Sequence, residues 1–176
     1  MKEKMEQKKK NIMVPILLFI TVTAVLVAVW ALFFQKEDVV LAPDYAPEQE
    51  EFAEEIPGDN DEQQESSEGG GRVSLTYSNQ VAIDLHEKTA DLLFANPGKS
   101  NQNMVLQIVI QDNVVVQSGT LVPGNQVKKL DLLDGAVQKL SEGGYDGKFV
   151  VLYYNPDSGE KAIVNTEIPI HITVNK

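Results

Sequence analysis

Two runs near the carboxyl end, 145–155 YDGKFVVLYYN and 162–174 AIVNTEIPIHITV, decide the fold class of this chain. Apolar side chains recur at every second position along most of both runs, which is the period of a half-buried β-strand. In the second run these positions are Ile168, Ile170, Ile172 and Val174. The residues between the runs, 155–160 NPDSGE, are typical of a hairpin loop. The two runs therefore predict a long antiparallel hairpin.

Shorter runs of the same kind fill the chain from residue 72 onward. Asp112-Asn113 is expected to connect two of them as a two-residue hairpin turn. Pro123 and Gly124 are expected at the centre of a type II turn, since Pro fixes φ and Gly tolerates positive φ. About seven or eight short strands separated by turns predict an all-β fold, an antiparallel β-sandwich, over residues 72–176. Residues 133–141 are expected to form at most about two helical turns.

The last predicted strand carries a proline, Pro169, which has no N–H to donate to a strand ladder. We therefore expect this strand to lie at a sheet edge. An exposed edge can accept a strand from another protein. Pro169, His171 and Thr173, on the outward face, are the expected contact residues.

The amino-terminal part contains an uncharged run of 23 residues, 12–34 IMVPILLFITVTAVLVAVWALFF. As a helix it would be roughly 35 Å long, enough to cross the hydrocarbon core of a membrane. Five lysines precede it in residues 1–11, and Lys36 alone follows closely, so residues 1–11 are expected in the cytoplasm and the rest outside. The alternative is a cleaved signal peptide, but the apolar run is longer than such peptides have and no good cleavage site follows it. The sequence predicts an uncleaved signal anchor.

Residues 35–71 carry thirteen acidic residues against Lys36, and they account for the formal net charge of −11. Low hydrophobicity and high charge predict a disordered acidic linker. A docking peptide for a basic partner, acting through Tyr45 and Phe52, is the alternative.

The glycine-rich stretch 141–148 SEGGYDGK ends in Gly-Lys, as phosphate-binding loops do. A P-loop requires glycine at position 142 and a hydroxyl at position 149, where the chain has Glu142 and Phe149. A strand, not a helix, is predicted after the stretch, so no helix N-terminus is expected beside an anion. The stretch is expected to be a structural bend.

Other chemistry lacks support in the sequence. There is no cysteine, and His86 and His171 are the two histidines, which is few for a zinc site. Asp131 and Asp134 are expected at a strand end and a turn, although their clustering with a histidine would favour an enzyme. We expect no catalysis, no cofactor and no small-molecule substrate. Nucleic acid is not expected as a partner because the chain is acidic.

The pair Gly144-Tyr145, with Leu140 upstream, resembles the tyrosine corner of immunoglobulin-like β-sandwiches. The resemblance implies that the hydroxyl of Tyr145 bonds to backbone a few residues upstream. The whole chain resembles small single-pass surface proteins of Gram-positive bacteria that carry one such domain. The cysteine pair of antibody domains is absent, and the sole tryptophan is Trp30 in the apolar run.

These observations favour a membrane-tethered extracytoplasmic interaction module. It would contact lipid through residues 12–34 and a protein partner through its β-domain. The alternative is a structural subunit of a membrane secretion or conjugation assembly, in which Ala24, Ala28 and Ala31 would form a close-packing helix face.

Overall fold

The computed structural model describes residues 17–27, 41–60, 62–65 and 70–176. It divides into two compact units, 1–39 and 40–176. In the first unit, residues 17–27 are helical. The remainder of the expected membrane span, 12–16 and 28–34, and the basic tail 1–11 lie outside the described residues. Within the described part of the chain, no helix is both long and apolar enough to cross a membrane.

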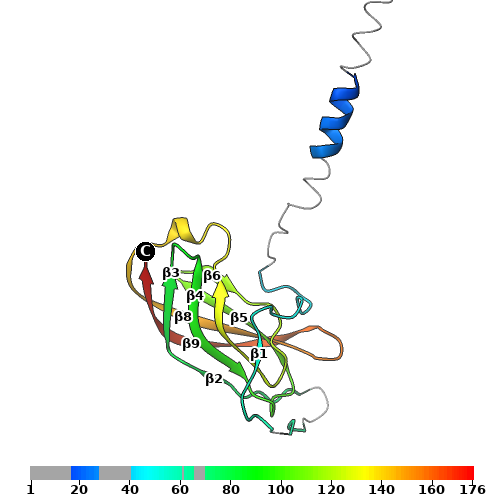
Figure 1. Cartoon of the computed structure of the whole chain (residues 1–176). Coiled ribbons are helices and arrows are strands. Elements are labelled where there is room, and N and C mark those ends of the chain that lie inside the picture. Colours follow the sequence, from blue (N-terminus) through cyan, green and yellow to red (C-terminus); the bar gives the residue numbers. More distant parts are fainter. Residues whose placement is uncertain (1–16, 28–40, 61, 66–69) are drawn as a thin grey trace, which may run out of the picture. The chain divides into compact units, whose positions relative to one another are not determined.

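The second unit is built almost entirely of strands (Figure 1). Its elements are β1 (Glu54–Glu55), β2 (Thr76–Tyr77), β3 (Gln80–Asp84), β4 (Thr89–Asn96), β5 (Asn103–Ile110), β6 (Asn113–Gln117), β7 (Asn125–Asp131), the 3-10 helix η1 (Val137–Lys139), β8 (Gly143–Tyr154) and β9 (Lys161–Asn175). The all-β prediction is confirmed. The short helix falls inside the stretch 133–141, where a helical turn or two was expected.

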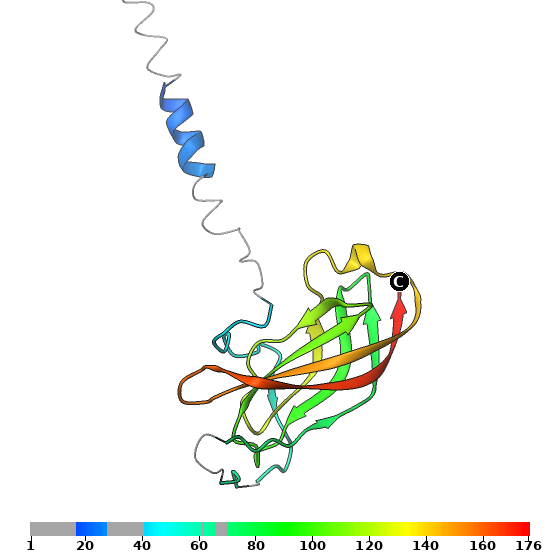
Figure 2. The same ribbon diagram turned by 180° about the vertical axis from the view of Figure 1, so that it is seen from behind.

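All nine strands belong to one curled sheet, in the order β1-β7-β4-β3-β9-β8-β5-β6, with β2 also paired to β4. The predicted hairpin is present as β8 and β9, and its tip projects away from the other strands (Figures 1 and 2). The sheet is not purely antiparallel, because β3 pairs with β9 in parallel, from Gln80 opposite His171 to Asp84 opposite Asn175. That part of the prediction is wrong. Alternation fixes which face a residue occupies, but it does not fix which strand lies beside it or in which direction.

The main core lies inside the curl, where side chains from every strand from β3 to β9 meet. Phe94 of β4 and Phe149 of β8 pack edge to face there, with ring centroids 5.9 Å apart. A second apolar cluster lies on the other face of β5 and β8, and it consists of Val105, Val109, Val150, Leu152 and Tyr154. The adjacent strands β5 and β8 are thus buried on both faces over much of their length.

A segment that the sequence assigned to the disordered linker, residues 41–60, lies against the β-domain. We call it the strap. Its Glu54–Glu55 pair forms β1 against β7, and Gln49 bridges Thr120 in parallel. Ala42 and Ala46 pack against the second apolar cluster. The prediction of disorder is therefore wrong for residues 41–60, while residues 35–40, 61 and 66–69 lie outside the described parts.

The strap is held by backbone and side-chain hydrogen bonds rather than by large apolar residues. The buried Tyr154 donates its hydroxyl to the carbonyl of Pro43 at 2.9 Å. The Glu50 carboxylate accepts the N–H of Gly119 at 2.6 Å. The Asp59 carboxylate accepts the N–H of Gly98 at the same distance. Acidic side chains that a composition argument counts as solvated therefore bind backbone donors of the domain.

Candidate functional site

The expected contact residues on β9 lie in two different environments. His171 pairs with Gln80 of β3 on one side and Asp146 of β8 on the other. Thr173 likewise pairs with Ala82 and Gly144. These two positions are inside the sheet, so the expectation of a sheet edge there is wrong. The cause is the parallel pairing of β3, which covers the side of β9 that alternation alone left open.

Pro169 lies just outside that paired region. It pairs with Lys148 of β8, but the parallel ladder with β3 begins only two residues later. The described residues provide no strand on the other side of β9 at Pro169. Pro169 also lines an open surface pocket of about 470 Å³. Asp146, Lys148 and Glu167 contribute the charged groups of this pocket, and Lys148 forms an ion pair with Glu167 at 2.9 Å.

Neither histidine joins a cluster of metal-binding side chains among the described residues. His171 is exposed, and its Nδ1 lies 3.0 Å from the Asp146 carboxylate. His86 is in the turn between β3 and β4. Neither described pocket is lined by Asp131 or Asp134, which lie at the end of β7 and in the turn after it. Over the described residues, no three His, Asp or Glu side chains are placed to hold a metal ion.

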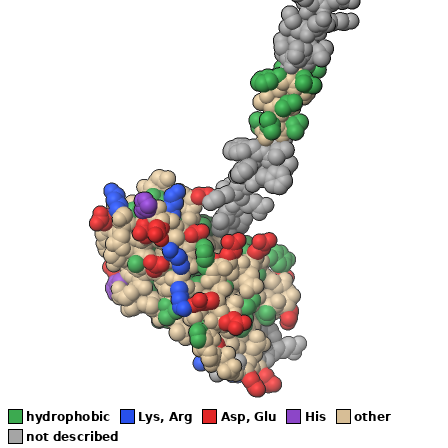
Figure 3. All heavy atoms as spheres, in the orientation of Figure 1, with side chains coloured by type: hydrophobic (Ala, Val, Ile, Leu, Met, Phe, Trp, Pro, Cys, Tyr) green, Lys and Arg blue, Asp and Glu red, His purple; other side chains and the backbone are tan. Residues whose placement is uncertain are grey.

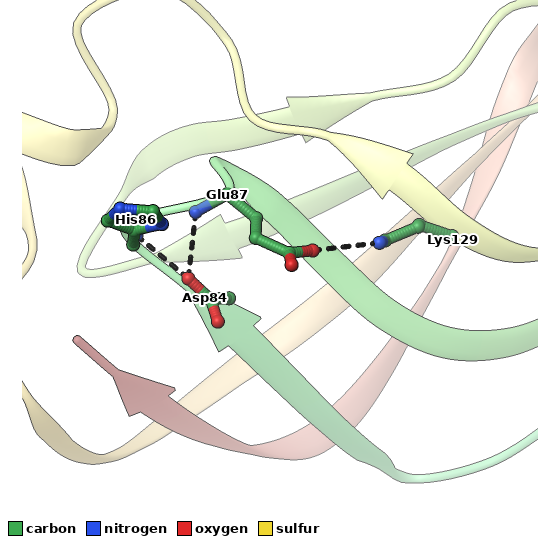
Figure 4. A network of polar contacts seen from close by, with 4 residues as sticks. All are labelled: Asp84, His86, Glu87 and Lys129. Carbon is green, nitrogen blue, oxygen red and sulfur yellow. Dashed lines mark hydrogen bonds and ion pairs between the residues drawn. The ribbon is translucent and has the colours of Figure 1, made fainter.

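The clearest polar network lies at the β3–β4 turn (Figure 4). The Asp84 carboxylate accepts the N–H groups of His86 and Glu87, both at 2.8 Å. The hydrogen bond from the Glu87 N–H is the largest influence lowering the pKa of Asp84. Glu87 in turn forms an ion pair with Lys129 of β7 at 3.1 Å, and this bond raises the pKa of Lys129. Among the described residues the His86 ring forms no hydrogen bond in this network, which fixes a turn and joins two strands.

Charged side chains of both signs lie interspersed on this face of the domain (Figure 3). The Lys129–Glu87 pair and an ion pair between Lys128 and Glu54 of the strap belong to it. Mixed signs of this kind do not form the single-sign field that attracts a highly charged ligand.

Pro123 and Gly124 lie in a turn, as expected, whereas Gly144 and Tyr145 lie in the first residues of β8. The prediction of a structural bend over 141–148 is therefore wrong for residues 143–148, which pair with β9. The Tyr145 hydroxyl donates to the carbonyl of Ser141 at 3.0 Å and accepts the Ser141 N–H at 3.1 Å, while Gly144 pairs with Thr173. Gly124 has φ 88°, and the N–H of Asn125 donates to the carbonyl of Val122, as a type II turn at Pro123-Gly124 requires.

Two details of the turns differ from expectation. The β5–β6 turn consists of Gln111 and Asp112, with φ of 48° and 62°, one residue earlier than predicted. Within the stretch 141–148, most of which belongs to β8, the glycine under the tightest steric constraint is Gly147. A Cβ there would lie 2.6 Å from Cδ1 of Ile172 and 2.8 Å from the carbonyl oxygen of Val109.

Sequence reasoning missed the feature that most distinguishes β9, which is its exposed apolar pair. Ile163 is fully exposed and Val164 is 69% exposed. The register between β8 and β9 shifts at this point, so that more residues of β9 than of β8 occupy the interval between Leu152 and Tyr154. Such a bulge re-aims side chains. The run AIVNT contains no charge or proline, which was the available signal of an unprotected edge.

Comparisons with known proteins add no identification. No protein-family profile matches the chain, and no curated protein matches it. Among solved structures, the chain is similar to AggA, the major subunit of aggregative adherence fimbriae type I from Escherichia coli. The match has 10% sequence identity and a TM-score of 0.29, and it covers 61% of this chain and 97% of that one. A TM-score this low supports no argument about fold or function.

Proposed function

We propose that this protein is a membrane-tethered extracytoplasmic interaction module. In this proposal residues 12–34 form a transmembrane signal anchor, with residues 1–11 in the cytoplasm. The β-domain, an immunoglobulin-like sandwich, presents its surface to a protein partner and catalyses no reaction. The chain would belong with single-pass surface proteins of Gram-positive bacteria.

The observation that carries the proposal is the uncharged run 12–34 with its basic flank, followed by a separate β-domain. The described part of that run, 17–27, supports it further. Its two polar side chains are Thr21 and Thr23, and both hydroxyls donate to carbonyls of the preceding helical turn, to Leu17 or Leu18 and to Phe19. Polar groups satisfied within the helix are what a hydrocarbon environment requires.

The strap that precedes the β-strands is docked on the β-domain. Pro43 and Ala42 accept hydrogen bonds from Tyr154 and Lys161 beside the β8–β9 hairpin. The first docked residue named here, Ala42, lies eight positions after the predicted span ends. The β-domain would therefore be displayed near the membrane surface.

Crosslinking on intact cells tests the proposal against the assembly-subunit alternative. A membrane-impermeant crosslinker is applied to cells expressing the native chain and to cells expressing a variant whose residues 12–34 are replaced by an unrelated apolar span. A tethered module captures the same partner in both. Loss of capture on span replacement, with the domain still at the surface, would favour an assembly subunit.

A further inference from the structure

We propose that the groove between residues 70–73 and the first half of β9 binds an extended, apolar segment with a basic end, from a partner protein, as an added β-strand. The inference rests on the proposed function, because it names the surface and the kind of partner that the interaction module uses. It follows from where two neighbouring strands separate, which side chains line the gap, and which charges lie at its end.

The strands β3 and β9 are paired only over their last residues. The N–H of His171 donates to the carbonyl of Asn79 at 2.8 Å, and pairing continues from there to Asp84 and Asn175. Before this point the chain on one side, 70–77, follows β4, whereas β9 follows β8 into the hairpin. The two strands therefore diverge, and a groove of about 830 Å³ opens between them.

Strand β9 presents an unpaired edge beside the groove, between Lys161, whose N–H donates to the carbonyl of Asp44 in the strap, and His171, whose N–H donates to Asn79. Because backbone groups alternate sides along a strand, Asn165, Glu167 and Pro169 direct theirs to the same side as His171, where the described residues provide no partner. On the opposite bank the N–H groups of Arg72 and Ser74 donate toward the 100–101 loop. An inserted peptide of about six residues, roughly 20 Å when extended, matches the free length of β9.

The side chains that line the banks are apolar or very small. Val73 is 44% exposed on one bank, and the fully exposed Ile163 and the 69% exposed Val164 lie on the other. Gly70 and Gly71 continue the first bank. Apolar side chains left in water on facing strand edges gain stability when an apolar segment covers them. The occupant is therefore an extended segment rich in β-branched residues.

Charge at one end fixes the orientation of that segment. Asp157 and Glu160 line the groove at the hairpin end, and neither has an ion-pair partner among the described residues. The nearby Lys161 uses its ammonium group to donate to the carbonyl of Ala42. A basic residue at the end of the peptide would complement the two carboxylates.

The test uses the full chain in detergent micelles and a fluorescent peptide of sequence Ser-Val-Thr-Val-Thr-Val-Lys-Lys. Fluorescence polarisation is expected to show saturable binding of one peptide per chain. Val164→Asp is expected to weaken binding by about tenfold or more, because it places a carboxylate where apolar contact is required. Phe52→Asp, an equivalent change at a 45% exposed apolar residue of the strap outside the groove, is the matched control and should bind normally.

A second peptide separates strand addition from simple apolar contact. The same sequence with N-methyl groups on all of its valine and threonine residues has no N–H in that stretch to donate to a ladder from either edge, and it is expected not to bind. The proposal is overturned if the wild-type chain shows no saturable binding, if Val164→Asp binds as tightly as wild type, or if the N-methylated peptide binds equally. Two other results would also overturn it. One is that the chain associates with itself and Val164→Asp abolishes this association. The other is that the chain binds phosphatidylglycerol vesicles through Val164. If the peptide does not bind, but the chain still captures a partner in the crosslinking experiment on intact cells, the groove proposal is refuted and the proposed function stands.

Discussion

The strap makes a strong prediction at Gly119, where it crosses the chain between β6 and β7. A Cβ at this position would lie 2.7 Å from the carbonyl oxygen of Glu48, 2.8 Å from the nitrogen of Glu50 and 2.9 Å from its Cα. All three are backbone atoms, so no side chain can move aside. Gly119→Ala must displace the strap.

Three hydrogen bonds surround the point of contact. The N–H of Gly119 donates to the Glu50 carboxylate, the N–H of Thr120 donates to the carbonyl of Glu48, and the N–H of Glu50 donates to the carbonyl of Thr120. At about 0.5–1.5 kcal/mol for each bond lost, the substitution is expected to lower the free energy of unfolding by about 2–4 kcal/mol. With an m-value of about 1.5–2 kcal/mol/M, the urea midpoint should fall by about 1–2 M.

The assay is urea unfolding of the full chain in detergent, followed by far-UV circular dichroism. Gly144→Ala is the matched control, because a Cβ at Gly144 meets no atom within 4 Å and its φ is not positive. Hydrogen exchange should also show faster exchange of the strap amides in Gly119→Ala. If the two variants unfold at the same urea concentration, the strap does not stabilise the domain and the reasoning is refuted.

Three further predictions concern single groups. Tyr145→Phe should lower the free energy of unfolding by about 0.5–1.5 kcal/mol, because the hydrogen bonds of its hydroxyl to Ser141 are lost. Tyr77→Phe is the control, because the Tyr77 hydroxyl has no such bond in the described residues. An unchanged melting midpoint for Tyr145→Phe would remove the tyrosine-corner assignment. Burial raises the pKa of Tyr154 above its usual value of 10.0, so the contribution of Tyr154 to stability should be constant below pH 10 and be lost above it. Tyr154→Phe should therefore lose less stability in alkali, and an identical alkaline profile in the variant would contradict this. Hydrogen bonds from the N–H of Glu87 and of His86 hold the pKa of Asp84 below its usual value of 3.8. The stability that ionised Asp84 contributes above that pH should therefore be lost as acid protonates it, and Asp84→Ala should lose less stability in acid than wild type. Equal acid sensitivity of the two chains would show that the turn does not depend on this carboxylate.

Local patterns predicted the local structure of this chain. The alternation in 145–155 and 162–174 gave the hairpin, Pro123-Gly124 gave the type II turn, and Gly144-Tyr145 gave the hydroxyl contact with the Ser141 backbone. Each depends on a period or on backbone dihedral preferences within a few residues. These are the properties that a sequence expresses directly.

The features that were missed depend on contacts between distant segments. The parallel pairing of β3 with β9 joins residues about ninety positions apart, and nothing in either run specifies the other. The strap is held by hydrogen bonds to Gly119, Thr120 and Tyr154, which leave no apolar period in 41–60. The sequence did contain one signal that a further segment covers β5. Nearly every residue of 104–110 is apolar, and a strand of that kind is buried on both faces.

The same limit applies to the candidate interaction surface. Pro169 drew attention to the last strand, but alternation could not show that β3 covers its second half. The open part of the edge lies earlier, at the exposed Ile163 and Val164. Their exposure follows from the register shift between β8 and β9 and from the divergence of β9 from β2, which are properties of the assembled sheet.

The most direct test of the account is the side of the membrane on which the β-domain lies. Because the chain has no cysteine, single-cysteine variants report this without background. Ser158→Cys, at the exposed tip of the β8–β9 hairpin, should react with a membrane-impermeant maleimide on intact cells. Lys9→Cys, before the predicted span, should react only after the membrane is permeabilised. The reverse pattern, with Ser158→Cys protected and Lys9→Cys labelled on intact cells, would contradict the account.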